Sequence, residues 1–117
     1  MATVTAYHNP ACSKSRGALD ILAARGVDVD VIEYLKTPPD RVMLARILSL
    51  LPSPPAALVR KDARFKELGL DPADYVTREQ VIALLDRHPE LMERPVVIRG
   101  GRAVIARPSE RVADILD

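Results

Sequence analysis

Apolar and polar positions divide the first 34 residues into strand, helix and strand. Val4–Tyr7 is a short, mainly apolar run that predicts a β-strand. Residues 8–11 contain Asn-Pro and predict a turn, after which apolar residues recur at near-helical spacing from Ser13 to Gly26, a good C-terminal stop. Residues 27–34 are rich in β-branched side chains and predict a second strand. Such a β-α-β unit makes the two strands parallel.

The middle of the chain, at about residues 37–90, has the pattern of a helical insertion. Thr37-Pro38-Pro39-Asp40 is typical of a helix start, and Pro52-Ser53-Pro54-Pro55 ends that helix. Short helices are predicted near residues 56–59 and 65–68. Thr77-Arg78-Glu79-Gln80 has the sequence of a capping box and predicts a further helix.

The C-terminal part returns to strands. Pro95–Arg99 and residues 102–106 are apolar, and Gly100-Gly101 between them is a hairpin signal, while Pro108-Ser109 opens a last helix. The order β-α-β, helical insertion, β-β-α is that of a thioredoxin-like α/β fold with a mixed four-stranded sheet. We therefore predict one domain over residues 1–117. Pro95 stands where such folds place a structural cis proline, although the sequence leaves the isomer open.

The amino-acid composition and net charge limit the classes of function that the chain can have. The chain has 117 residues, 48% of them apolar, which fits a single globular domain. Lys and Arg number 17 against 16 Asp and Glu, a net charge of +1 that argues against nucleic acid or an anionic membrane as a partner. No apolar stretch reaches the ~18 residues of a membrane span, and the N-terminus lacks the basic start of a signal peptide. We expect a cytoplasmic monomer.

Cys12 is the one cysteine of the sequence, so no intramolecular disulfide or cysteine-rich metal site can form. A lone cysteine is commonly a small buried apolar residue. This one, however, lies at a predicted helix start, where backbone N–H groups and the helix dipole stabilise a thiolate, with Lys14 and Arg16 nearby. Lowering a thiol pKa by two units requires about 2.7 kcal/mol and makes it mostly thiolate at neutral pH.

Cys12-Ser13-Lys14-Ser15 is a Cys-x-x-Ser sequence, which can form a mixed disulfide but needs an external thiol to resolve it. Ala18 excludes the Cys-x5-Arg loop of tyrosine-phosphatase-like enzymes. His8 is either a base or cation partner of Cys12 or a structural turn residue. Ser15 either donates to the thiolate or caps the helix. Both pairs of alternatives stay open.

Three arginines stand at the ends of predicted elements. Arg60 ends a short helix, Arg94 precedes Pro95, and Arg107 precedes Pro108. Guanidinium groups present forked donors and a permanent charge, which suit a tetrahedral oxyanion. Spacing alone does not single out these three among the arginines of the chain.

Several segments together resemble the glutaredoxin-linked arsenate reductase (ArsC) family. They run in the family's order over nearly the whole chain: residues 7–16, 34–39, 58–61, 88–89, 93–97 and 106–109. The resemblance implies a thioredoxin-like fold in which Cys12 is the nucleophile and His8 and Ser15 lower its pKa. It implies that Arg60, Arg94 and Arg107 bind arsenate. No bound cofactor or metal is expected; glutathione is a co-substrate and glutaredoxin the protein partner.

One departure and two alternatives accompany the resemblance. The best-known members continue past the final helix, whereas this chain stops at Asp117 and resembles a short branch of the family. A glutathione-dependent thiol reductase without arsenate specificity would need Cys12 but not the arginines. An Spx-like regulator that binds RNA polymerase would share the fold, although Ser15 and the retained arginines argue against it.

Overall fold

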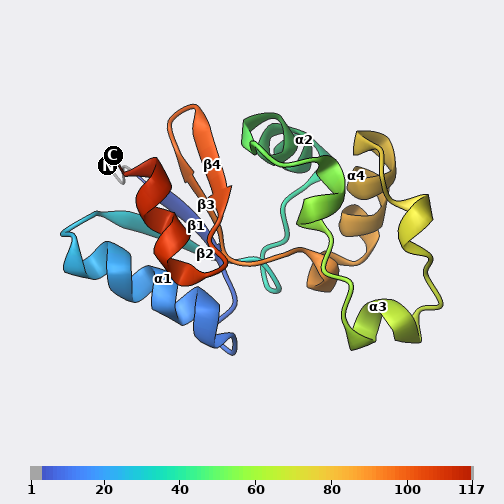
Figure 1. Ribbon diagram of the computed structural model, residues 1–117, viewed down its shortest axis with the longest axis horizontal. Coiled ribbons are helices and arrows are strands. Elements are labelled where there is room, and N and C mark those ends of the chain that lie inside the picture. Colours follow the sequence, from blue (N-terminus) through green and yellow to red (C-terminus); the bar gives the residue numbers. More distant parts are fainter. Residues whose placement is uncertain (1–3, 117) are drawn as a thin grey trace.

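The computed structural model describes residues 4–116 and contains a four-stranded mixed sheet in the order β2-β1-β3-β4 (Figure 1). Strand β1 (Val4–His8) runs parallel to β2 (Val29–Glu33), as the predicted β-α-β unit requires. On its other side β1 pairs antiparallel with β3 (Val96–Arg99), which pairs antiparallel with β4 (Arg102–Ile105). This arrangement confirms the predicted thioredoxin-like α/β fold.

One face of the sheet is covered by the two helical segments nearest the chain ends. Helix α1 (Ser13–Ala24) and a 3₁₀ helix (Ser109–Ile115) lie side by side there (Figure 1). The last segment is thus not the α-helix that its sequence suggests. Its two buried apolar residues, Val112 and Ile115, are three positions apart, and this spacing aligns side chains on one edge of a 3₁₀ helix. They join a buried cluster with Val4, Ala6, Ala18, Leu22, Val97, Val104 and Ala106.

The helical insertion lies on the side of the sheet away from α1 (Figure 1). It contains α2 (Arg41–Leu50), α3 (Ala63–Glu67) and α4 (Arg78–Arg87). Two 3₁₀ helices, at Pro55–Leu58 and Pro72–Asp74, lie between them, and a third, at Pro89–Leu91, follows α4. A second buried cluster connects the insertion to the sheet through Leu44, Ile47, Leu48, Leu58, Leu85, Leu91, Met92, Val96, Ile98 and Ala103, among others.

Helix starts in the insertion follow the capping rules. Asp40 accepts a hydrogen bond from the Met43 N–H at 2.8 Å and so caps α2. The predicted capping box at α4 is confirmed, because the Thr77 hydroxyl accepts from the Gln80 N–H while the Gln80 side chain accepts from the Thr77 N–H. These hydrogen bonds satisfy backbone donors that helix starts otherwise leave unpaired.

The Arg94–Pro95 peptide bond is cis, as the fold suggested for Pro95, and β3 begins one residue later. The Arg107–Pro108 bond is also cis, which the sequence did not indicate. Within residues 4–116 no helix is both long and apolar enough to cross a membrane. Over the same range, His, Cys, Asp and Glu side chains form no group of three or more that could hold a metal ion.

Candidate active site

Cys12 ends the loop that joins β1 to α1. The Asn9 side chain accepts from the Ala11 N–H at 3.0 Å, and the Asn9 carbonyl accepts from the Cys12 N–H at 3.0 Å. The Cys12 carbonyl accepts the first hydrogen bond of the helix, from the Arg16 N–H. Cys12 is therefore the N-cap residue of α1, and its thiol lies where the helix start leaves backbone donors free.

The surroundings of Cys12 favour the thiolate. Burial raises the pKa of the thiol, but the Ser15 N–H, the Arg94 guanidinium and the Lys14 N–H outweigh burial and bring the pKa to about 7. About half of the thiol is therefore ionised at neutral pH. Lys14 lowers the pKa of the thiol through its backbone N–H rather than through its ammonium group. The Arg16 guanidinium donates to the Pro10 carbonyl at 3.0 Å.

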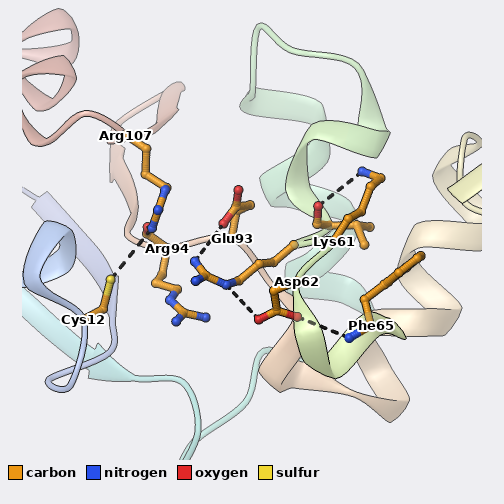
Figure 2. A network of polar contacts seen from close by, with 9 residues as sticks. Cys12, Lys61, Asp62, Phe65, Glu93, Arg94 and Arg107 are labelled. Atoms are coloured by element: carbon orange, nitrogen blue, oxygen red, sulfur yellow. Dashed lines mark hydrogen bonds and ion pairs between the residues drawn. The ribbon is translucent and has the colours of Figure 1, made fainter. Parts of the chain in front are cut away.

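Arg94 and Arg107 reach Cys12 from the two segments that precede the cis prolines (Figure 2). Arg107 Nη1 lies 3.8 Å from Cys12 Sγ and donates to the Arg94 carbonyl at 3.3 Å. Burial lowers the pKa of Arg94, but Cys12 and Tyr34 hold it above its ordinary value. Within the described residues neither guanidinium forms an ion pair with a carboxylate. Both charges therefore face the thiol.

The C-terminal 3₁₀ helix is also tied directly to the helix that carries the thiol. The Ser109 hydroxyl donates to the Lys14 carbonyl at 2.8 Å. Gly17, one turn further along α1, faces the same serine, and a Cβ at this position would lie 2.7 Å from Ser109 Oγ. This close approach fixes the segment after Arg107 against the first turn of α1.

Arg60, by contrast, is held by carboxylates. Its Nε donates to Asp62 Oδ2 at 2.9 Å, and its Nη1 lies 3.6 Å from Glu93 Oε1 (Figure 2). Glu93 precedes Arg94, so these contacts tie Arg60 to the segment that carries Arg94. Among the described residues Arg60 makes no hydrogen bond with Cys12. The structure therefore brings Arg94 and Arg107 to the thiol, whereas Arg60 pairs with Asp62 and with Glu93, the residue before Arg94.

His8 and Ser15 form a pair beside the thiol. His8 is the last residue of β1, not part of the turn that Asn-Pro suggested, because its pairing with Glu33 extends the strand. Its Nδ1 lies 2.7 Å from Ser15 Oγ, and that hydroxyl accepts from the Asn9 N–H at 3.1 Å. Burial lowers the pKa of His8 although Glu33 opposes it, which favours neutral imidazole at neutral pH. The geometry favours an orienting role for both residues rather than a cationic His8.

Tyr34 is a residue that the sequence did not single out. It follows β2 and is fully buried, and its hydroxyl lies in the electrostatic environment of Arg94, Asn9 and Cys12. The sequence signal was weak: an aromatic residue at the C-terminal end of a strand, next to the polar residue Glu33.

Comparisons with known proteins agree with this geometry. The sequence profile of the ArsC family matches residues 7–115. An arsenate reductase of Neisseria meningitidis serogroup A is 42% identical, with 99% of this chain and 100% of that relative covered. An arsenate reductase of Escherichia coli is 39% identical, with 99% of this chain and 82% of that relative covered. The solved structure of an arsenate reductase from Vibrio cholerae superposes with a TM-score of 0.86 at 38% identity, over 97% of this chain and 98% of that one.

These matches span almost all of the described residues, including the thiol loop, both segments before the cis prolines and the insertion between them. The sequence, the sheet topology and the location of Cys12 lead to one assignment. The chain belongs to the ArsC family.

Proposed function

We propose that the protein reduces arsenate to arsenite, with Cys12 as the nucleophile and glutathione and glutaredoxin as external reductants. The observation that carries this proposal is a single thiol of pKa about 7 at a helix start, faced by two arginines that have no carboxylate partner among the described residues. The curated relatives named as arsenate reductases, which match 99% of the chain, support the choice of arsenate.

In the first step the Cys12 thiolate attacks arsenic in the +5 state. A sulfur–arsenic bond forms, and one arsenate oxygen takes up protons and leaves as water. Arg94 and Arg107 would hold the remaining oxygens by charge-assisted hydrogen bonds, and Arg60 would supply a third guanidinium as the family resemblance implies. The neutral His8 and Ser15 would keep the thiol loop in place.

In the second step glutathione supplies the other electron. Its sulfur attacks Cys12 Sγ, the sulfur–sulfur bond forms as the sulfur–arsenic bond breaks, and the electron pair of that bond stays on arsenic. Arsenic falls from +5 to +3, each sulfur is oxidised by one, and arsenite leaves. Glutaredoxin then reduces the mixed disulfide and restores the thiolate. Because Cys12 is the one cysteine of the sequence, this second thiol must come from outside the chain.

This chemistry requires a reducing compartment, so the proposal includes a cytoplasmic location. It requires only one copy of the chain, since Cys12, Arg60, Arg94 and Arg107 all belong to the same polypeptide. A monomer would therefore be sufficient.

The test is a coupled assay that contains arsenate, glutathione, glutaredoxin, glutathione reductase and NADPH. We expect arsenate-dependent loss of NADPH with the wild type and none with Cys12→Ser, which keeps the size of the side chain but removes the thiolate. Absence of arsenate-dependent turnover in the wild type would overturn the proposal. In that case a glutathionylated peptide in place of arsenate would test the general thiol reductase.

A further inference from the structure

Tyr34 has a hydroxyl group that the fold leaves without a partner. Its side chain is fully buried within the cluster that joins the insertion to the sheet. Within the described residues its oxygen makes no hydrogen bond of good geometry, although the Arg94 and Asn9 side chains lie close enough to lower its pKa. Buried hydroxyl groups are nearly always paired, because removal from water without a replacement partner is unfavourable. The Tyr34 hydroxyl therefore has its donor available to a group bound next to it.

The sheet places this hydroxyl group at the thiol. Glu33 at the end of β2 pairs with His8 at the end of β1, so the next residues, Tyr34 and Asn9, leave the sheet at the same edge. Burial raises the pKa of Tyr34 even though Arg94 and Asn9 act to lower it, with Cys12 opposing them. The phenol accordingly remains protonated at neutral pH and is able to donate a hydrogen bond.

A second buried donor at the same site is also unpaired. Arg94 Nε has no hydrogen-bond partner in the described part of the chain. Arg94 directly precedes the cis proline before β3, which pairs with β1 on the side opposite β2, and in Figure 2 its side chain extends beside Cys12. Two buried donors, the Tyr34 hydroxyl and the Arg94 Nε–H, thus lie close to each other and to Cys12, and neither makes a hydrogen bond of good geometry in the described structure. A group with several acceptor oxygens and no protons to donate matches both of them.

We propose that the Tyr34 hydroxyl donates a hydrogen bond to an oxygen of the oxyanion bound beside Cys12 and is a specificity-determining residue of this site. This inference rests on the proposed function, since it takes arsenate as the oxyanion. Together, Tyr34 and Arg94 would donate hydrogen bonds to oxygens of the oxyanion that Arg107 does not contact.

The test is Tyr34→Phe, which removes the oxygen and keeps the buried ring. Tyr7→Phe is the matched control: Tyr7 is also buried, but its hydroxyl interacts with Asp40, Asp30 and Arg46 rather than with the thiol. For both variants we would measure the arsenate KM in the coupled assay, the melting temperature, and the pH dependence of Cys12 alkylation.

For Tyr34→Phe we expect the KM for arsenate to rise about tenfold, the effect of losing one hydrogen bond to a charged group. The melting temperature should stay the same or rise, because the lost hydroxyl had no partner in the free protein. The alkylation profile should not move. Tyr7→Phe should leave the KM unchanged.

Three results would overturn the inference. An unchanged KM would mean that the hydroxyl does not meet the oxyanion. A shifted alkylation profile with an unchanged KM would mean that Tyr34 acts through the thiol instead. A rise in KM accompanied by an equal loss of melting temperature in both variants would mean a structural role. Lack of arsenate turnover in the wild type is a different failure, which removes the proposed function and this inference together.

Discussion

Two sets of guanidinium groups in this molecule differ in what surrounds them. Arg94 and Arg107 face the Cys12 thiol, and in the described structure neither of them forms an ion pair with a carboxylate. Arg60 lies between Asp62 and Glu93, with both carboxylates within ion-pair distance. The sequence presents the three as equivalent arginines at the ends of elements.

The difference teaches where positive charge is available. A guanidinium with two carboxylate neighbours is largely neutralised before any ligand arrives, whereas one without them keeps its charge for a thiolate or an oxyanion. Glu93 directly precedes Arg94 in the chain but pairs with Arg60. Most of the uncompensated positive charge of the site therefore lies beside Cys12.

The largest effect should come from removing a free guanidinium. We expect Arg107→Ala to lower kcat/KM for arsenate by roughly a hundredfold, since a hydrogen bond between charged groups contributes about 1.5–3 kcal/mol. Arg60→Ala should lower it by about fivefold at most, because its charge is already compensated. Arg41→Ala is the control, since Arg41 is exposed and pairs with Asp86 on the surface. An equal loss of kcat/KM in Arg60→Ala and Arg107→Ala would contradict the proposed difference between the paired and the unpaired arginines.

A smaller effect should appear in the ionisation of Cys12. Alkylation of the wild type should rise with pH through a midpoint of about 7. Arg94 lowers the pKa of the thiol, so Arg94→Gln should move the midpoint upward, toward the ordinary value of 9.0. Each unit of that rise lowers the thiolate fraction at pH 7 by up to about tenfold.

Lys61→Gln is the charge-matched control for this titration. The Lys61 ammonium donates to the Ala56 and Val59 carbonyls in the insertion, so its removal should not shift the midpoint. An Arg94→Gln midpoint equal to that of the wild type would mean that the helix start alone sets the thiol pKa.

A still smaller effect should follow from freeing Arg60. Glu93→Gln removes one of its two carboxylates and should lower the KM for arsenate about threefold, the scale of a partly exposed ion pair. Glu90→Gln is the control, because Glu90 lies three residues earlier and pairs with Arg64 and His88 instead. If Glu93→Gln leaves the KM unchanged, Arg60 does not contribute to the oxyanion site.

The smallest effect on activity should come from the far end of the insertion. Thr77→Ala removes the cap of α4 and should lower the free energy of unfolding by about 1 kcal/mol, while Thr77→Ser should retain most of it. Neither change should alter kcat/KM. Chemical denaturation and the coupled assay together check this, and a loss of turnover in Thr77→Ala would show that the insertion supports the thiol site.

The sequence predicted those parts of the fold that depend on local signals. The capping box at Thr77, the Gly100-Gly101 hairpin and the helix from Ser13 to Gly26 were visible because each requires particular residues at fixed spacing. The 3₁₀ form of Ser109–Ile115 was not, since apolar residues three apart fit either kind of helix. His8 was placed in the turn because pairing with β2 is a long-range contact.

The site was predictable in part for the same reason. The position of Cys12 at a helix start follows from its neighbours in sequence. The separation of Arg60 from Arg94 and Arg107 depends on where Asp62 and Glu93 lie in space, which no spacing reveals. The unpaired hydroxyl of Tyr34 could not be foreseen either, because an unmade hydrogen bond has no sequence signature.

The contact between Arg107 and Cys12 joins residues 95 positions apart, and Ser109 is fastened to Lys14 over the same separation. During synthesis on the ribosome Cys12 emerges early, whereas both of these partners emerge near the end. The nascent thiol therefore lacks the Arg107 charge, and Arg94 as well, while most of the chain is being made. We expect the pKa of Cys12 to reach its final value of about 7 only when translation is nearly complete, because the Arg94 contribution is missing until then.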